Sequence, residues 1–378
     1  MKTGQERVLT THTGSLPRPA WLTDRGDQDA VRAAAAELVR RQLAAGVDVV
    51  NDGEASKPSY STYVLDRLTG FGGEPVAIRR WGYEDFPEYA RKQWGGEASQ
   101  GRSVRNALAG NPTCDGPVSY RDLAPVTADI ANLRAGAGAA PGATGLFMSA
   151  ASPGVIEMFM PNRYYPGSGE YLFALADAMK TEYDAIHQAG LVLQLDCPDL
   201  ACDWALGERR PVADFRAVVA RRIEALNHAT RDIPAEAMRL HLCWGNYEGP
   251  HHTDIPLAEI IDLVLAARPA GLSFEAANPR HAHEWQLFED LRLPDGKVLI
   301  PGVLDSTTNY IEHPELVAQR LCRYAGLVGR ENVMAGTDCG FATFATFTLV
   351  EPEICWAKLA AMAEGARLAT SRLWGRAR

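Results

Sequence analysis

Residues 238–245 read MRLHLCWG, a short apolar run in which His241 and Cys243 alternate with leucines. Because side chains on a strand alternate between its two faces, a strand here would carry His241 and Cys243 on one face, near its carboxyl end. The stretch before it, VADFRAVVARRIEALNHAT (212–230), has apolar residues every three to four positions, as one face of a helix does. This part of the chain therefore indicates an α/β fold in which a strand ends in chemically active side chains.

Seven other runs share the short length and apolar composition of this one, and most are separated by amphipathic stretches that end in glycine. The runs are 8–15, 47–54, 145–154, 191–199, 272–278, 298–305 and 332–340. Eight strands that alternate with helices predict an α/β fold of the (β/α)8 type, a TIM barrel. In such barrels the chemistry lies at the carboxyl ends of the strands.

The stretch from Ala55 to Thr144 is far longer than an ordinary connection between two strands. We predict a single domain, 1–378, in which 55–144 is an insertion that covers the mouth of the barrel and contains a short strand at Thr113–Tyr120. The cluster of arginine and aromatic residues from Arg79 to Trp94 is compatible with a clamp on an anionic donor, a subunit interface or a solvated lid.

The composition narrows the class of protein. The chain has 378 residues, of which 46% are hydrophobic and 22% charged, as in ordinary globular proteins. Its net charge of -9 argues against nucleic acid or an anionic membrane as a partner. No signal-peptide core or run of 18 apolar residues is present, and seven scattered cysteines fit a reducing compartment, so we expect a cytoplasmic protein. A homo-oligomer remains open, and no glycine-rich phosphate motif predicts a nucleotide cofactor.

Four residues of metal-binding type follow three of the predicted strands, the fifth, sixth and eighth: His241, Cys243, Glu275 and Cys339. One imidazole, two thiolates and a carboxylate are an ordinary set for Zn²⁺. Taken one at a time, the cysteines could be buried core residues and the glutamate an ion-pair partner. Their common position at strand ends favours a zinc site. Cys197 and Cys202 are accompanied by no such partners, and we expect them to be structural.

Such a zinc site suits the activation of a thiol. The carboxylate is the weakest of the four ligands for a borderline-soft ion, so an incoming thiol could displace it. Zinc would lower the pKa of that thiol from about 8.5 and give a thiolate at neutral pH. Transfer of an alkyl group to sulfur is the chemistry that follows.

These four residues, together with TTHTGSLPR (10–18), NDGE (51–54), QLDCPD (194–199) and GTDCGF (336–341), resemble the C-terminal catalytic barrel of cobalamin-independent methionine synthase. The resemblance covers nearly the whole chain, without the N-terminal barrel of that family. Single-barrel relatives include epoxyalkane:coenzyme M transferase, which opens an epoxide with a thiol at a similar zinc site. The resemblance implies zinc held by His241, Cys243, Glu275 and Cys339.

The same resemblance implies a site for the amino-acid part of homocysteine. The matching residues are Gly14, Ser15, Glu54 and Asp196. Hydroxyl and backbone donors suit a carboxylate, and two carboxylates suit an ammonium group. The alternative is that Ser15 caps a turn and that the acidic residues pair with basic side chains. Two carboxylates favour an amino-acid thiol over a sulfonate thiol, which has no ammonium group.

One catalytic residue of the family is missing. The synthases have a histidine shortly after the aspartate that ends the seventh strand, whereas this chain reads GVLDSTTNYIEH, with Ser306 after Asp305. We therefore expect Asp305, His281 and His12 to manage protons, which puts folate as methyl donor in question.

The sequence thus predicts a zinc-dependent S-methyltransferase that acts on homocysteine or a similar amino-acid thiol. One rival is the opening of an epoxide by a zinc-bound thiol, for which a histidine or a tyrosine would supply the proton. Another is a barrel with structural zinc that only binds a ligand or partner.

Overall fold

The computed structural model describes residues 4–76, 83–95, 111–206, 209–346 and 348–375. The predicted residues Arg79 to Trp94 therefore lie partly outside the described part of the chain. Six parallel strands form one sheet in the order β1-β4-β5-β6-β7-β8. Their bounds are Val49–Val50, Gly145–Ala151, Val192–Asp196, Met238–Leu242, Gly271–Phe274 and Val298–Pro301. Almost every residue of these strands is buried, which is typical of parallel sheets covered by helices.

The sheet curls, and two bridged segments join its ends. Residues 333–336 pair in parallel with β8 through Leu299–Val333 and Gly302–Gly336, and Thr10 pairs in parallel with Ala335. The carbonyl of Thr10 then accepts the backbone N–H of Val49, the first residue of β1, at 3.0 Å. Side chains from both segments pack with β1, β4 and β8 in one buried cluster, made of Leu9, Val49, Phe147, Val298, Ile300 and Met334.

Six of the eight predicted strands are therefore regular strands, in the predicted order. The first and the eighth, 8–15 and 332–340, are bridged segments, so the prediction of eight regular strands is only partly confirmed. In the first of these segments, side chains take backbone donors that a regular strand would use. The N–H of Thr10 donates to Asp48 Oδ2 at 2.9 Å, and the N–H of Thr13 donates to Thr337 Oγ1 at 3.1 Å. Those donors are lost to a continuous strand ladder.

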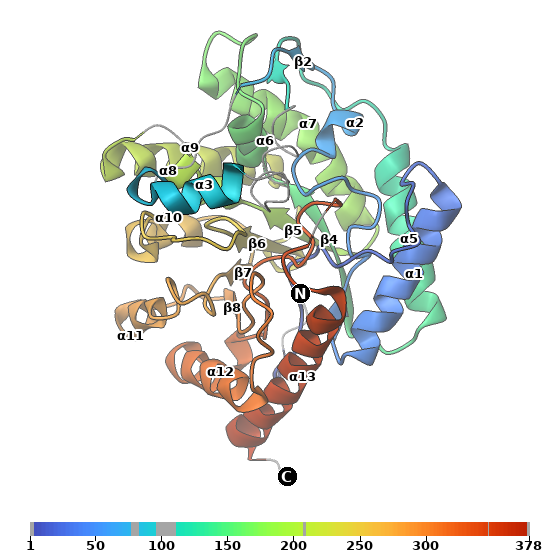
Figure 1. Ribbon diagram of the computed structural model, residues 1–378, viewed down its shortest axis with the longest axis vertical. Helices are drawn as coiled ribbons and strands as arrows, with labels where there is room; N and C mark the ends of the chain where they lie inside the picture. The colour runs from blue at the N-terminus through green and yellow to red at the C-terminus, as the bar shows by residue number, and fades with distance from the viewer. Residues whose placement is uncertain (1–3, 77–82, 96–110, 207–208, 347, 376–378) are drawn as a thin grey trace.

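Helices cover the outside of the curled sheet (Figure 1). The longer ones are α1 (Gln28–Ala44), α5 (Ala124–Ala139), α7 (Ser168–Gln188), α9 (Val212–Ala229), α12 (Pro314–Val328) and α13 (Pro352–Trp374). The shorter ones are α2 (Val64–Arg67), α3 (Pro87–Gly95), α6 (Pro153–Phe159), α8 (Asp203–Leu206), α10 (Ile261–Leu265) and α11 (Leu287–Asp290). In the described part of the chain, no helix combines the length and the apolar composition needed to cross a membrane.

The long connection between β1 and β4 contains a small antiparallel pair, β2 (Phe71–Gly73) with β3 (Thr113–Cys114). The predicted strand at Thr113–Tyr120 is thus present but only two residues long. The end of the connection, α5, packs beside α1 among the outer helices. Near α3, the Tyr89 hydroxyl donates to the carbonyl of Glu248, and Asp85 lies 2.9 Å from His252. The segment 83–95 therefore contacts the loop that follows β6.

Candidate active site

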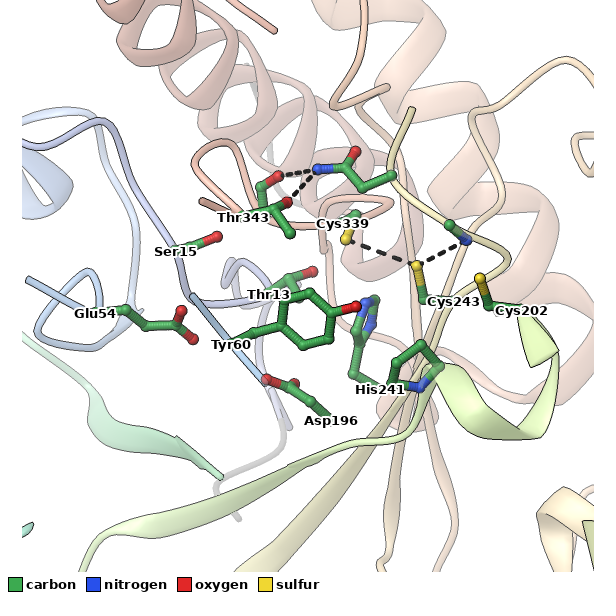
Figure 2. Close-up of a pocket in the computed structure, with 14 residues that line it drawn as sticks. Thr13, Ser15, Glu54, Tyr60, Asp196, Cys202, His241, Cys243, Cys339 and Thr343 are labelled. Carbon is green, nitrogen blue, oxygen red and sulfur yellow. Dashed lines mark hydrogen bonds between the residues drawn. The ribbon is translucent and has the colours of Figure 1, made fainter. Parts of the chain in front are cut away.

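A small pocket opens at the carboxyl ends of the strands (Figure 2). Its volume is about 50 Å³. The lining residues come from the ends of β5 and β6 and from the loops that follow β1, β5, β6 and the two bridged segments. They are Thr13, Ser15, Glu54, Tyr60, Asp196, Pro198, Cys202, His241, Cys243, Gly245, Asn246, Cys339, Gly340 and Thr343. This is the end of the strands at which the sequence predicts the chemistry.

Three of the four predicted metal ligands meet on one side of this pocket. The ligand atoms of His241, Cys243 and Cys339 all lie within 4.8 Å of one another, and the two sulfur atoms are 3.8 Å apart. All three residues are buried. Neither ring nitrogen of His241 has a hydrogen-bond partner. An unsatisfied buried imidazole beside two thiols fits a bound soft or borderline cation, which would supply the missing partner.

The electrostatics of this group agree with that use. Burial, assisted by the positive charge of Arg239, lowers the pKa of His241 to about 3, so the ring is neutral at pH 7 and has a lone pair to offer. The hydrogen bond with Cys339, together with burial, raises the pKa of the Cys243 thiol well above its usual value. A nearby cation is therefore needed before this thiol becomes a thiolate at neutral pH.

Glu275, the fourth predicted ligand, lies next to this group but outside its 4.8 Å cluster. One carboxylate oxygen accepts the backbone N–H of Trp244 at 2.8 Å, and the other accepts Nδ2 of Asn278 at 3.0 Å. A carboxylate has about four lone-pair sites, so two hydrogen bonds leave others free.

The loop that carries Glu275 is held from the neighbouring strand end by Asp338. Its carboxylate accepts the backbone N–H groups of Ala276 and Ala277 at 2.8 Å each and that of Asn278 at 2.6 Å. Asp338 thereby fixes the loop that carries Glu275 relative to the next residue in the chain, Cys339.

The predicted amino-acid site lies on the opposite side of the pocket, where Figure 2 shows Glu54 and Ser15. Glu54 is buried and has the positive φ of 58°, a backbone conformation that costs energy in a residue with a side chain. Ser149 Oγ donates to Glu54 Oε1, whereas Glu54 Oε2 is buried without a partner. A Cβ on Gly14 would lie 2.9 Å from Glu54 Oε1, so this position requires glycine.

Asp196 supplies a second carboxyl group to the same side. Burial, followed by the negative charge of Glu54, raises its pKa to about 7. Two buried carboxyl groups that repel each other favour a bound cation between them. Ser15 is tied to the last bridged segment, because its carbonyl accepts the N–H of Phe341 at 2.9 Å.

None of the three predicted proton-transfer residues is among the residues that line the pocket. His12 is buried, its Nε2 lies 2.8 Å from Gln42 Oε1, and burial lowers its pKa to about 3. Asp305 Oδ1 accepts the N–H groups of Thr307 at 2.6 Å and Thr308 at 3.2 Å, and so stabilises its own turn.

His281 belongs to a separate buried group. It stacks on Trp244 at 4.1 Å between ring centres and lies between two carboxylates, 3.3 Å from Asp254 and 2.9 Å from Glu284. Burial lowers the pKa of His281, but these two partners more than offset it and raise the pKa to about 10. His251 completes the group, with Nδ1 2.5 Å from Asp254 Oδ2.

Several pocket residues were not singled out from the sequence. Asn246 Nδ2 donates to the carbonyl of Gly340 at 2.8 Å and to Thr343 Oγ1 at 2.6 Å. Its Oδ1 accepts the hydroxyl of Ser306 at 2.9 Å. Ser306, which follows Asp305, is therefore engaged in a loop contact. Only the position of Asn246 shortly after His241-x-Cys243 could have suggested its role. Cys202, expected to be structural, also lines the pocket.

No family model matches this chain. Several curated proteins are similar to it over nearly their whole length. A methionine synthase of Saccharolobus islandicus is 26% identical over 379 residues, which cover 96% of this chain and 95% of that protein. The 2-hydroxypropyl-CoM lyase of Xanthobacter autotrophicus is 24% identical over 423 residues, which cover 97% of this chain and 96% of that protein.

Solved structures with the same fold bear related names. A B12-independent methionine synthase from Shewanella sp. W3-18-1 has a TM-score of 0.74 at 20% identity and covers 98% of this chain and 100% of its own. A putative vitamin-B12 independent methionine synthase from Listeria monocytogenes has a TM-score of 0.64 at 17% identity, with 96% and 98% covered. The resemblance drawn from the sequence is thus confirmed: over nearly its whole length this chain is a relative of proteins named methionine synthase and 2-hydroxypropyl-CoM lyase.

Proposed function

We propose that this protein is a zinc-dependent S-methyltransferase that methylates homocysteine or a similar amino-acid thiol. One observation carries the proposal. A single pocket has unsatisfied His241 nitrogens beside two thiols on one side and the unpaired Glu54 Oε2 on the other. A molecule with a thiol at one end and an ammonium group at the other would satisfy both.

The metal would be held by His241, Cys243 and Cys339, with Glu275 as the fourth and weakest ligand. Two sulfurs and an imidazole favour zinc over hard cations, which prefer oxygen. When bound, zinc lowers the pKa of a coordinated thiol so that sulfur is a thiolate at neutral pH. Glu275 would be the ligand that an incoming thiol replaces, because the hydrogen bonds from Trp244 and Asn278 would still satisfy its two oxygens.

The amino-acid end of the substrate would be held by Glu54, Asp196 and Ser15. A buried ammonium group between the two carboxyl groups would lower the pKa of Asp196 and favour its ionised form. The Ser15 hydroxyl would donate to the substrate carboxylate. Fixing both ends of a small thiol in a pocket of about 50 Å³ aligns the sulfur for an in-line displacement.

The chemical step is a displacement at carbon. The sulfur–carbon bond forms as the bond between the methyl carbon and its leaving atom breaks, and the electron pair of that bond goes to the leaving atom. Relatives named methionine synthase support this assignment. The identity of the methyl donor is left open, because Ser306, Thr307 and Thr308 follow Asp305 where the resemblance implies a proton-donating histidine.

The alternative is the opening of an epoxide by the zinc-bound thiol. The relative named 2-hydroxypropyl-CoM lyase, at 24% identity over 97% of this chain, favours it. The unpaired carboxylate of Glu54 argues against a sulfonate thiol in the same pocket, since it would face a negative charge instead of an ammonium group.

Zinc K-edge absorption of the purified protein, with and without L-homocysteine, tests both the metal and the acceptor. The proposal expects two sulfur scatterers without the thiol and three with it, one light atom being lost. Cys339→Ser should remove one sulfur in both states, whereas Cys322→Ser, in helix α12, should leave the spectrum unchanged. Protein without zinc after purification in zinc-containing buffer, or an unchanged shell with the thiol, would overturn the proposal.

A further inference from the structure

Tyr60 differs from four other tyrosines in the state of its hydroxyl. Four buried or half-buried tyrosines donate to a protein acceptor at 2.5–2.9 Å: Tyr63 and Tyr120 to Glu182, Tyr171 to the carbonyl of Met160, and Tyr183 to the carbonyl of Ala151. The hydroxyl of Tyr60 has no such acceptor among the described residues, and Tyr60 lines the pocket. Figure 2 shows its ring reaching into the space between Asp196, His241 and Cys243.

The ring is held in that position. It makes edge contacts with Phe159 and Phe344, with ring centres 6.0 and 6.4 Å apart. The backbone is fixed as well, because Ser59 pairs with Phe344 and the N–H of Ala345 donates to the carbonyl of Pro58 at 2.9 Å. A hydroxyl that is positioned by its ring and left without a partner is arranged for something that enters the pocket.

We propose that the Tyr60 hydroxyl is the proton donor to the leaving atom of the alkyl donor, in place of the histidine that this chain lacks after Asp305. The inference rests on the proposed function, since it needs a thiolate in the pocket to attack the donor. It names the chemical class of the donor: one whose leaving atom is an oxygen or nitrogen that requires a proton.

The protons and electrons of such a cycle balance. The incoming thiol gives up its proton when its sulfur becomes a metal ligand. As the sulfur–carbon bond forms, the carbon–oxygen or carbon–nitrogen bond breaks, and its electron pair stays on the leaving atom, which takes the proton of Tyr60. The resulting phenolate is reprotonated by the proton released from the next thiol. The sum is thiol plus donor giving thioether plus protonated leaving group.

Other candidates for this step are engaged elsewhere. His12, His281 and Asp305 are not among the pocket-lining residues, and the carboxyl groups of Glu54 and Asp196 are proposed to hold an ammonium group. The ordinary pKa of a tyrosine hydroxyl is about 10, so the proton is present at neutral pH. A departing alkoxide or amide anion is a stronger base than phenolate, so transfer to it is favourable in the transition state.

The test compares two small electrophiles on zinc-loaded protein with bound L-homocysteine. Epoxypropane leaves an alkoxide that needs a proton, whereas trimethylsulfonium leaves dimethyl sulfide, which needs none. We expect Tyr60→Phe to slow epoxide opening about 10²- to 10⁴-fold, the usual contribution of a general acid. Its rate with trimethylsulfonium should match that of the unmodified protein, and so should its zinc spectrum with homocysteine. Tyr164→Phe, at an exposed tyrosine, is the matched control and should change neither rate.

Three results would overturn the inference alone, provided that homocysteine still enters the zinc shell. They are an equal loss with both electrophiles, which indicates a structural role; no loss with either; and no reaction of the bound thiolate with epoxypropane in the unmodified protein. A zinc shell that does not change with homocysteine would instead overturn the proposed function, and the inference with it.

Discussion

Two buried clusters lie close together in this protein, one around His241 and the other around His251 and His281. They differ in whether the histidine nitrogens have hydrogen-bond partners. In the first, His241 faces Cys243 and Cys339 with both ring nitrogens unsatisfied. In the second, each ring nitrogen of His281 and His251 meets an acceptor, from Asp254, Glu284 or the carbonyl of Tyr247. The comparison teaches that metal-type residues in a cluster do not define a metal site. Only the unsatisfied group has free nitrogen positions for the proposed metal, whereas the satisfied group holds a loop.

The second group acts on the first through Trp244, the residue after Cys243. The Trp244 ring stacks on His281, and its Nε1 donates to the carbonyl of Ile255 at 2.7 Å. Glu284, which pairs with His281, also accepts the N–H of Leu257 at 2.6 Å. The loop from 243 to 257 is therefore held at several points by groups that never enter the pocket.

The largest expected effect comes from removing a ligand of the unsatisfied group. Cys339→Ser should lower zinc affinity and turnover by more than about a hundredfold, because the loss of a direct ligand exceeds the 10- to 100-fold typical of residues that only support ligands. Metal content after dialysis and the rate of thioether formation measure this. Cys322→Ser is the control. Unchanged zinc content in Cys339→Ser would contradict the assignment of the group around His241 as the metal site.

Removing His281 should instead affect stability. His281→Ala leaves Asp254 and Glu284 buried without this partner, and we expect the free energy of unfolding to fall by about 3–5 kcal/mol, as for other broken buried ion pairs. Urea unfolding of the metal-loaded protein measures the loss. At low denaturant the variant should still bind one zinc. Loss of zinc at full folding would mean that His281 belongs to the metal site.

Glu54→Gln tests the opposite side of the pocket. Replacing a charged partner of the ammonium group should raise the KM for homocysteine about 10- to 100-fold, since hydrogen bonds to charged groups contribute about 1.5–3 kcal/mol. The zinc shell should be unchanged. A thiol without an amino group, such as 2-mercaptoethanol, should react equally well with both proteins. An equal loss with both thiols would indicate that Glu54 only supports the loop.

Over a single pH unit, the smallest expected effect is a pH dependence of stability that belongs to the satisfied group. The folded pKa of His281, raised to about 10, lies above the value of about 6.5 expected in the unfolded chain. Its contribution is therefore complete below about pH 6.5 and is lost as pH rises towards 10, by at most about 1.4 kcal/mol per pH unit. Urea unfolding at several pH values should show this slope in the unmodified protein. A slope that persists in His281→Gln would assign it to another residue.

The strand order and the metal-type residues could be predicted from the sequence because both follow from short-range periodicity. Alternation along one strand is enough to place His241 and Cys243 on one face, and an apolar run is enough to mark β6. The unsatisfied His241 nitrogens and the unpaired Glu54 oxygen are consequences of packing, which no local pattern encodes.

Tyr60 and Asn246 could not be predicted for a different reason. Their places in the pocket depend on contacts between loops far apart in the chain, such as the pairing of Ser59 with Phe344 and the hydrogen bond from Asn246 to Gly340. The sequence points to His281 because a histidine close to Glu275 in the chain resembles a catalytic residue. Its two carboxylate partners are visible only in the folded structure.

The way in which the bridged segments join the two ends of the sheet affects the order of folding and metal binding. Cys243 and Cys339 are separated by 96 positions in the chain, and Cys339 follows the bridged segment that links β8 to Thr10. In an unfolded chain, the two sulfurs could bind one ion only after the entropic cost of closing that long loop had been met. We therefore expect the sheet to fold before the metal binds. We expect the metal to bind late in refolding. During unfolding, we expect metal release to be an early sign that the contacts joining β8 to residues 333–336 and Thr10 have broken, while the outer helices are still intact.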